Sequence, residues 1–283
     1  MGALKTFDGL APGNYDLRAV ALGGAYTALA ADANALHYNP AGLGLAAGGQ
    51  ATFMHNQYFE DISQEYFAYA SPWGWGAALN YLDFGGAQRT TVSNPTGAGL
   101  GEVNLTSLAA GLGYGRELLP GFSAGAGLKY IKEDVAGETG TGYALDFGLL
   151  YSPAAVKGLS LGFAVQNMGS SVRFYEDTES LPLNLRAGAA YAFSVKGLPA
   201  LVAVDAAKRL HEDAYACAGA EVVVAGRFPL RLGYSGLNDD GSGLTAGGGY
   251  RVRALSFDYA FVPYKELGAA HRFSVTYMWG KGE

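Results

Sequence analysis

Two stretches decide the fold of this chain: LSFDYAF (Leu255–Phe261) and RFSVTYMW (Arg272–Trp279). In both, large apolar side chains alternate with small or polar ones. A period of two places the apolar side chains on one face of an extended strand. We therefore predict that both stretches are β-strands with one apolar face and one polar face.

The same alternation of apolar with small or polar side chains repeats from about residue 48 to residue 280. Segments of about ten alternating residues are separated by turns rich in Gly, Pro, Asn or Asp. An even number of strands, here about fourteen, suits a closed antiparallel barrel. The predicted strands begin near Gly49, Ile62, Trp73, Val103, Phe122, Gly142, Gly158, Leu183, Ala200, Ala214, Phe228, Leu244, Ala254 and Arg272.

The composition favours a barrel that faces lipid. Only 16% of the residues are charged, whereas soluble domains carry about 25%. Glycine is abundant, with 43 residues, and the chain has 19 Tyr and 14 Phe. The mean hydropathy of +0.09 is near neutral, as expected when strands face lipid on one side and a lumen on the other. We therefore predict an all-β fold, a transmembrane antiparallel barrel.

The two faces of the predicted strands differ in character. A soluble sandwich also alternates, but two features favour the membrane barrel. Aromatic residues gather at strand ends on the apolar face, as in interfacial girdles: Trp73, Trp75, Tyr81, Tyr114, Tyr130, Tyr151, Tyr191, Phe193 and Trp279. The other face is mostly Gly, Ala and Ser, with candidate lumen residues at Asn80, Lys129, Asp146, Gln166, Asn184, Arg186, Asp205, Glu221, Arg231, Asp258 and Arg272.

These lumen charges have two interpretations. The three arginines, Arg186, Arg231 and Arg272, pair with Asp146, Glu221 and Asp258 to hold a plug, or they line an ion-selective path. Cys217 shares the parity of Glu221, so we expect it to face inward. Three longer polar connections are predicted on the extracellular side, and short turns on the periplasmic side. The longer ones span residues 85–101, 168–181 and 238–243, and the short ones include 118–121 and 153–157.

Residues 1–47 do not alternate. The stretch from Ala19 to Leu36 is compatible with a helix and ends at NPAGLG, where Asn39 and Pro40 break the pattern. We predict two parts: residues 1–47 as a partly helical hatch in the lumen, and residues 48–283 as the barrel.

The stretch LGGAYTALAADANALHYNPAGLG (Leu22–Gly44) resembles the N-terminal signature of the PorV/PorQ family, within the FadL-like outer-membrane barrels. The residues of this hatch motif are Gly23, Gly24, Asn39, Pro40, Ala41, Gly42 and Leu43. Four later blocks resemble the family in the same order: GLSLGFAVQNMG (158–169), LPLNLRAGAAY (181–191), LRLGYS (230–235) and SFDYAFVPYKELGAAHRFSVTY (256–277).

The resemblance implies a fourteen-stranded barrel whose N-terminal segment enters the lumen, with Asn39, Pro40 and Ala41 as its marker. FadL-like members pass hydrophobic compounds across the outer membrane, whereas PorV acts as a partner in type IX protein secretion. We therefore expect a barrel in the bacterial outer membrane, with its leader peptide already removed, that binds or passes a small hydrophobic compound. The alternatives are an anchor or partner subunit of a secretion or surface assembly, and a soluble β-rich binding protein.

Other function classes have little support. The net charge of -6 and the pI near 5.3 argue against nucleic acid as a partner. The string GFSAG (Gly121–Gly125) fits a nucleophile elbow, but a strand follows Ser123 where that motif needs a helix. No metal or nucleotide motif is present, and we interpret the acidic loop Asn238–Asp240 as a solvated turn. We expect no enzyme activity, no metal and no cofactor.

Overall fold

The computed structural model describes residues 16–58, 62–169, 172–173, 178–179, 181–237, 241–264 and 268–280. Antiparallel strands dominate these residues, and three short helical elements precede the first strand. Among the described residues, no helix is long and apolar enough to cross a membrane.

Fourteen long strands form one sheet, and the two-residue piece β8 (Val172–Arg173) pairs with β6 beyond the end of β7 and with the piece β9 (Thr178–Glu179). The long strands are β1 (Gly49–Gln57), β2 (Ser63–Ala70), β3 (Trp75–Gln88), β4 (Glu102–Leu119), β5 (Phe122–Val135), β6 (Glu138–Tyr151), β7 (Leu159–Gly169), β10 (Asn184–Val195), β11 (Leu198–Arg209), β12 (Ala214–Val224), β13 (Phe228–Ser235), β14 (Leu244–Val252), β15 (Leu255–Tyr264) and β16 (Gly268–Trp279).

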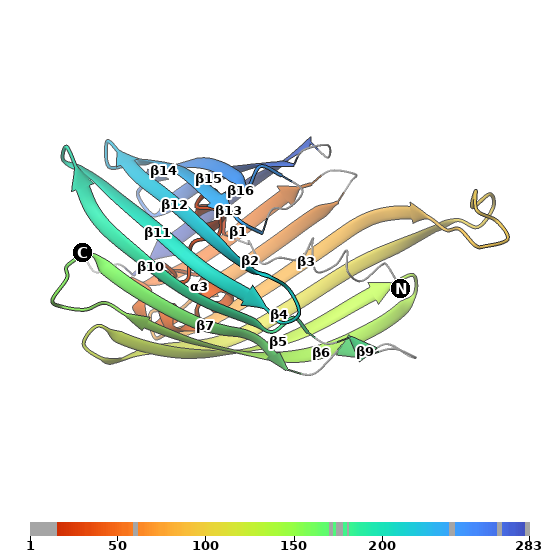
Figure 1. Cartoon of the computed structure of the whole chain (residues 1–283), viewed down its shortest axis with the longest axis horizontal. Coiled ribbons are helices and arrows are strands. Elements are labelled where there is room, and N and C mark those ends of the chain that lie inside the picture. Colours follow the sequence, from red (N-terminus) through yellow and green to blue (C-terminus); the bar gives the residue numbers. More distant parts are fainter. Residues whose placement is uncertain are drawn as a thin grey trace.

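The sheet closes on itself. Neighbouring long strands pair antiparallel, β1 pairs with β16, and the pairing of β5 with β6 completes the ring. Figure 1 shows the strands tilted around a common interior. The predicted closed antiparallel barrel is thus confirmed. The largest differences from the predicted strand starts are four residues, at Glu138 against Gly142 and at Gly268 against Arg272.

The apolar face of the wall points outward. Leu128, Phe257 and Phe273 expose 51%, 43% and 56% of their surface, whereas Ser123, on the other face of β5, exposes 1%. A wall of exposed apolar side chains of this size is unfavourable in water and is stable only when lipid or another molecule covers it. The parity predicted from the sequence is therefore the parity of the barrel, with small and polar side chains inside.

The two ends of the barrel carry different connections. One end, called here the short-turn end, has the connections 71–74, 120–121, 152–158, 196–197, 225–227 and 253–254. The opposite end, the long-loop end, has the long connections 89–101, 170–183 and 236–243 and the shorter ones 58–62, 136–137, 210–213 and 265–267. The three long connections correspond to the three predicted ones, with bounds shifted by two to four residues. Parts of the second and third, including Asn238–Asp240, lie outside the described residues.

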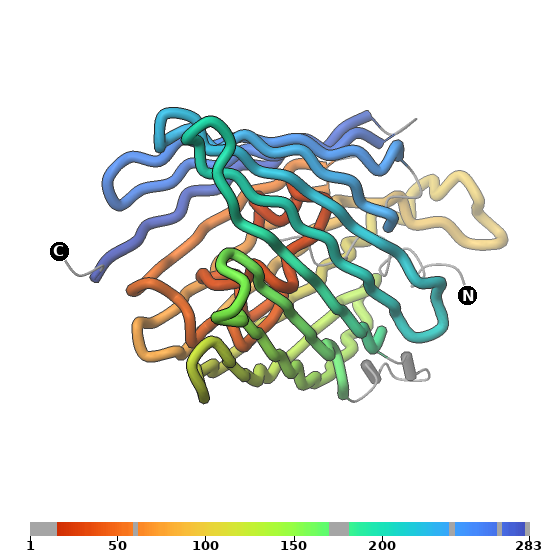
Figure 2. The backbone as a smooth tube through the Cα atoms, turned by 60° about the vertical axis from the view of Figure 1, so that its left-hand side comes forward, coloured from red at the N-terminus to blue at the C-terminus, as the bar shows by residue number. Residues whose placement is uncertain are grey.

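Residues 16–45 lie inside the ring of strands (Figures 1 and 2). They form α2 (Leu17–Ala21), α3 (Ala35–Tyr38) and the 3-10 helix η1 (Pro40–Leu45). The stretch from Ala19 to Leu36, compatible with a helix by its sequence, is helical only at its two ends. Gly23 and Gly24 have φ of 68° and 89°, a left-handed conformation that ends α2 and that glycine adopts without a steric penalty.

The hydrophobic core of the molecule is built around this segment. Leu17, Tyr26 and Tyr38 are fully buried, as are Met54 and Ala68 on the inner face of the wall. The barrel interior is therefore a packed core in the part that residues 16–45 occupy, and not an open water channel.

Candidate functional site in the barrel lumen

Inward-facing glycines let the wall and residues 16–45 approach each other. A Cβ atom added at Gly115 or Gly125 would lie 2.3 Å from the carbonyl oxygen of Pro40. One added at Gly233 would lie 2.2 Å from the backbone nitrogen of Gly23. Because such distances are far below van der Waals contact, only glycine fits at these wall positions.

The NPAGL motif joins two parts of the segment to the wall. The Nδ2 atom of Asn39 donates to the carbonyl oxygens of Thr27 and of Leu149 on β6, both at 2.9 Å. Its Oδ1 accepts from the backbone nitrogen of Ala41 at 3.2 Å, which begins η1. Pro40 at the start of η1 has no N–H to satisfy.

Gly24, Gly42 and Leu43 of the motif each make a close contact inside the barrel. A Cβ added at Gly42 would lie 1.6 Å from the carbonyl oxygen of Ala30, so the segment folds back tightly on itself. Leu43 packs against the backbone of Gly76 on β3. Gly24 presents its carbonyl oxygen to Arg186 at 2.6 Å.

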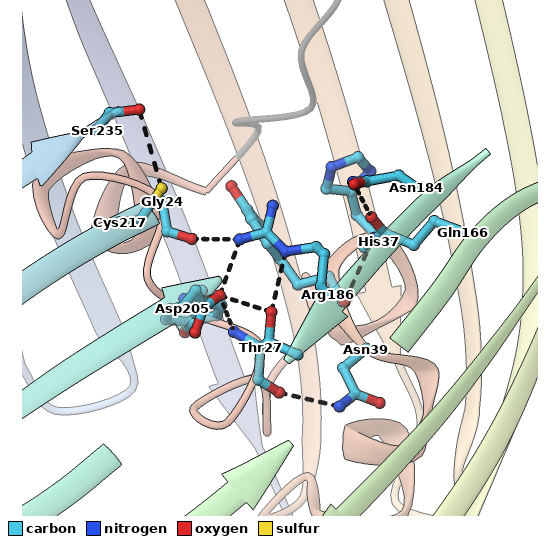
Figure 3. Close-up of polar contacts among 12 residues, drawn as sticks. Gly24, Thr27, His37, Asn39, Gln166, Asn184, Arg186, Asp205, Cys217 and Ser235 are labelled. Atoms are coloured by element: carbon cyan, nitrogen blue, oxygen red, sulfur yellow. Dashed lines mark hydrogen bonds and ion pairs between the residues drawn. The ribbon is translucent and has the colours of Figure 1, made fainter. Parts of the chain in front are cut away.

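One buried cluster ties the segment to β10 and β11 (Figure 3). The Oδ2 atom of Asp205 accepts from the backbone nitrogens of Tyr26 at 3.1 Å and Thr27 at 3.0 Å, and from the Thr27 hydroxyl at 2.6 Å. Arg186 donates to the same oxygen at 2.8 Å. The Asp205 side chain is 1% exposed, so its charge is balanced by this arginine and by N–H donors of the segment.

A second cluster ties the segment to β12, β13 and β15. Arg18, in α2, donates to both carboxylate oxygens of Glu221, at 2.9 and 3.0 Å. Arg231 donates to Glu221 at 2.6 Å and to Asp258 at 2.5 Å. Two guanidinium groups and two carboxylates thus alternate across the lumen, which balances their charge inside the barrel.

The candidate lumen residues all lie on the inner face, but their pairing differs in part from the prediction. Arg231 meets Glu221 and Asp258, as one interpretation expected, whereas Arg186 pairs with Asp205. Asp146 pairs with Lys129 at 2.6 Å instead of with an arginine. The remaining contacts link Arg272 to Tyr58, Asn80 to Gln64, and Asn184 to Gln166.

Some functional residues were missed from the sequence. Arg18 and Thr27 make the contacts that join the segment to the wall. They belong to the non-alternating part of the chain, where no period shows which side chains face the barrel.

Two residues predicted to face the lumen do so. Gln166 donates to the carbonyl oxygen of His37 at 2.6 Å. Cys217 is buried, as its parity predicts.

An acidic pair lies at the start of the segment, before the strands. Asp16 caps α2 by accepting from the backbone nitrogen of Arg18 at 2.9 Å. Burial, together with the carboxylate of Asp32, raises the pKa of Asp16 to about 7. Asp32 accepts from the hydroxyl of Tyr26, and burial raises its pKa as well. Burial thus makes both carboxyl groups harder to ionise than ordinary aspartates.

A small cavity of about 30 Å³ lies between α3 and the wall. Alanine and glycine form most of its wall side, and Leu36 and His37 close it from the segment. Its lining residues are Leu36, His37, Tyr66, Ala78, Asn80, Ala109, Ala110, Gly111 and Lys129. It is thus a mainly apolar space with a few polar groups, the usual make-up of a small-molecule site.

The nucleophile-elbow geometry is absent at GFSAG. Ser123 lies in β5, which continues without interruption to Val135. An elbow needs a sharp strand-to-helix turn at the serine. In the part of the chain that the structure describes, no group of three His, Cys, Asp or Glu side chains is placed to hold a metal ion.

The fold is similar to three solved structures of low sequence identity. The toluene transporter TbuX of Ralstonia pickettii superposes with a TM-score of 0.67 at 13% identity, over 96% of this chain and 100% of that one. The toluene transporter TodX of Pseudomonas putida gives 0.63 at 14%, over 92% and 96%. A FadL homologue of Pseudomonas aeruginosa gives 0.57 at 12%, over 94% and 98%. The likeness shows a shared FadL-like barrel fold.

Two curated relatives, both described as UPF0164 protein, come from Treponema pallidum (strain Nichols). One is 29% identical over 166 residues, which is 54% of this chain and 50% of the relative. The other is 29% identical over 185 residues, which is 58% and 44%. The chain spans about half the length of the curated relatives it matches. The finer PorV/PorQ placement stays a prediction. A family model described as uncharacterised protein family (UPF0164) matches residues 16–181, so the chain belongs to UPF0164.

Proposed function

We propose that this chain is a bacterial outer-membrane barrel that binds or passes a small hydrophobic compound, with residues 1–47 as a hatch in its lumen. The cavity beside α3 carries this proposal. Two of the similar folds are described as toluene transporters, which supports a transport role and gives no support to catalysis.

The lining of the cavity suggests the class of compound, because alanine, glycine and leucine form most of it. Its volume of about 30 Å³ holds about two water molecules, since one water needs about 10–15 Å³. A small hydrophobic compound therefore fits only when α3 and Leu36 move aside and enlarge this space. Asn80 and Lys129 at its edge would orient a compound with a polar group.

The membrane assignment rests on the outer face. The exposed side chains there include aliphatic residues at mid-height, such as Leu128, and aromatic residues nearer the strand ends, such as Trp75. A belt of aromatic residues beside an aliphatic band is the pattern of barrels that cross a membrane. Outer-membrane lipid is thus the first partner of this surface.

The hatch role rests on the position of residues 16–45. Because they pack across the interior of the barrel, a compound that crosses the lumen requires them to move or to leave a path at their side. The charged clusters hold the segment along β10–β15, while the cavity lies along β2–β5. We therefore expect the path to follow the cavity side.

A pair of alanines on β3 tests the proposal. Ala78 lines the cavity, and Ala77 is its neighbour on the outward face. Ala78→Phe fills the cavity, and Ala77→Phe adds the same ring to the lipid-facing side. The measurement is binding of toluene to the barrel in lipid nanodiscs, corrected with empty nanodiscs.

We expect Ala78→Phe to weaken toluene binding by about tenfold or more, equivalent to about 1.4 kcal/mol, and Ala77→Phe to leave it unchanged. Equal binding by both variants would show that the cavity is not the site. If the unaltered barrel binds no toluene and instead co-purifies with an exported protein, the role of a secretion or surface-assembly partner replaces this proposal.

A further inference from the structure

Exposed basic side chains gather at the short-turn end of the barrel. Arg116 lies near the end of β4 on its outward face, and the other four lie in or beside the turns. These five residues, called here the basic collar, are Arg116, Lys157, Lys196, Arg227 and Arg253. Among the described residues in or beside these turns, Glu117 alone is acidic. Its carboxylate accepts a hydrogen bond from the backbone N–H of Gly121 at 2.8 Å.

The collar follows the perimeter of the barrel. Its members come from β4, the β6–β7 turn, the β10–β11 turn, the β12–β13 turn and the β14–β15 turn. A protein partner would meet one side of the barrel or the mouth of the lumen. Charges spread around the rim, each in a different turn, instead match a partner that surrounds the barrel.

Aromatic pairs lie directly beside the collar on the outer face. Trp75 and Tyr114 have ring centroids 4.8 Å apart, and Arg116 follows two positions after Tyr114. Tyr191 and Phe193 stack at 5.9 Å shortly before Lys196. Phe228 and Tyr250 stack at 5.1 Å, with Arg227 and Arg253 close by in the sequence.

Aromatic rings mark the boundary between hydrocarbon and headgroups in membrane barrels. The collar lies just beyond them, toward the end of the strands, and so at the height of the lipid phosphates. Arginine and lysine bind phosphate oxygens through charge-assisted hydrogen bonds.

The long-loop end has the opposite balance. Its described rim carries more acidic than basic residues, namely Glu65, Glu102, Glu133, Asp134, Glu138, Glu212 and Asp213 against Arg89, Lys132, Lys208 and Arg209. Two of the four basic residues pair locally, Lys132 with Asp134 at 2.8 Å and Arg209 with Glu212 at 3.6 Å. Among the described residues, net positive charge is thus found at the short-turn end and net negative charge at the long-loop end.

We propose that the basic collar binds the phosphate headgroups of anionic glycerophospholipids in the leaflet around the short-turn end. This inference rests on the proposed membrane location. Anionic lipid is then enriched next to the collar and fixes the orientation and depth of the barrel, because each turn contributes one contact.

The chain contains its own reporters for this lipid. All three of its tryptophans, Trp73, Trp75 and Trp279, lie at the short-turn end. Brominated phospholipids quench tryptophan on contact. The experiment compares quenching by brominated phosphatidylglycerol and by brominated phosphatidylcholine, at equal mole fraction, in vesicles that contain the folded barrel.

We expect phosphatidylglycerol to be preferred by roughly threefold or more at low salt, and the preference to shrink at high salt. A variant with all five collar residues changed to Gln should lose the preference. The matched control is Arg89→Gln with Lys132→Gln and Lys208→Gln at the long-loop end, which should retain it.

The outcomes separate this inference from the proposed function. Equal quenching of the unaltered barrel by the two lipids overturns the lipid assignment alone, and an acidic protein then becomes the partner of the collar. Quenching by neither lipid, with a chain that stays soluble without detergent, overturns the membrane location itself. A folded barrel is recognised independently by its altered migration on SDS gels when it is not heated.

Discussion

The two halves of the lumen wall make different kinds of contact with residues 16–45. Along β10–β15, buried charges hold the segment: Asp205 binds the backbone of Tyr26 and Thr27, and Glu221 binds Arg18. Along β2–β5, the wall packs closely on η1 at Gly115 and Gly125, but small residues such as Ala78 and Gly111 leave a cavity beside α3. One half thus holds the segment by buried charges, and the other half packs on η1 and leaves space only at α3.

This difference shows how a barrel with a segment packed in its lumen can still open a route for a small compound. Charged contacts inside a protein are costly to break, because each partner left behind is a buried charge without compensation. Contacts between small apolar groups are weaker and leave room for rearrangement. Movement of the segment is therefore expected at α3 before it occurs at the clusters, and the half that moves is the half that contains the cavity.

The largest expected effect comes from Asp205→Ala. The change leaves the guanidinium of Arg186 buried and removes the acceptor of Tyr26 and Thr27. Breaking a buried pair in this way costs about 3–5 kcal/mol. We expect residues 16–45 to become susceptible to protease in the folded barrel, while the strands stay protected. Limited proteolysis with mass spectrometry measures this.

The matched control for that change is Asp134→Ala. Asp134 also pairs with a basic residue, Lys132, but their side chains are 37% and 40% exposed. Surface pairs contribute about 0–1 kcal/mol, so this variant should digest like the unaltered barrel. Equal protection of residues 16–45 in both variants would show that the charged half does not hold the segment.

A pair of glycines sharpens the comparison with a smaller effect. Gly233 lies on the charged half, and an added Cβ would meet backbone atoms of Leu22 and Gly23 at 2.3 and 2.2 Å. Gly111 lies on the cavity half, and an added Cβ would meet the end of the Leu36 side chain at 3.3 Å. Gly233→Ala should cost about 1–3 kcal/mol, and Gly111→Ala less than about 0.5 kcal/mol.

Urea unfolding of the two glycine variants in lipid vesicles, followed by tryptophan fluorescence, compares their stabilities. Hydrogen exchange shows where any loosening occurs. Similar losses in both variants, or a larger loss for Gly111→Ala, would remove the distinction between a tight half and a permissive half.

The most local expected effect depends on pH. The pKa of Asp16 is about 7 in the folded chain, against 3.8 for the ordinary group. Because the folded state holds the proton more tightly, its stability falls as the pH rises from about 4 to about 7, and it does not fall further through this group above that range. We expect hydrogen exchange in α2, corrected for intrinsic rates, to increase from pH 5 to pH 8.

Asp16→Asn is the control, because it keeps a capping side chain and carries no titratable proton. Exchange in α2 should then change much less over the same pH range. If the variant and the unaltered chain respond equally, another group, such as Asp32, is responsible for the pH effect.

The sequence predicts the wall of this molecule much better than its contents. Strict alternation in stretches such as Leu255–Phe261 determines which residues face inward, because a strand offers only two directions. The parity of Arg186 and Arg231 could therefore be predicted. Their partners could not, since pairing across the lumen depends on the register and on the course of a segment without a period.

The interior segment shows why the rest was not predictable. The residues from Ala19 to Leu36 favour helix by composition, but the left-handed turn at Gly23 and Gly24 is selected by contact with the wall, at Tyr234 and Arg186. Thr27 has no sequence feature that marks it as a partner of Asp205. The cavity is equally hidden, because alanines such as Ala78 are common on any lumen face.

The seam between β1 and β16 has a consequence for biogenesis. Gly49 pairs with Trp279 there, so the first and last strands of the ring hydrogen-bond to each other. A nascent sheet that lacks β16 keeps two open edges, which hydrocarbon does not tolerate. Sealing must therefore wait for the last strand to be delivered, and residues 16–45, which precede β1, have to be enclosed at or before that step.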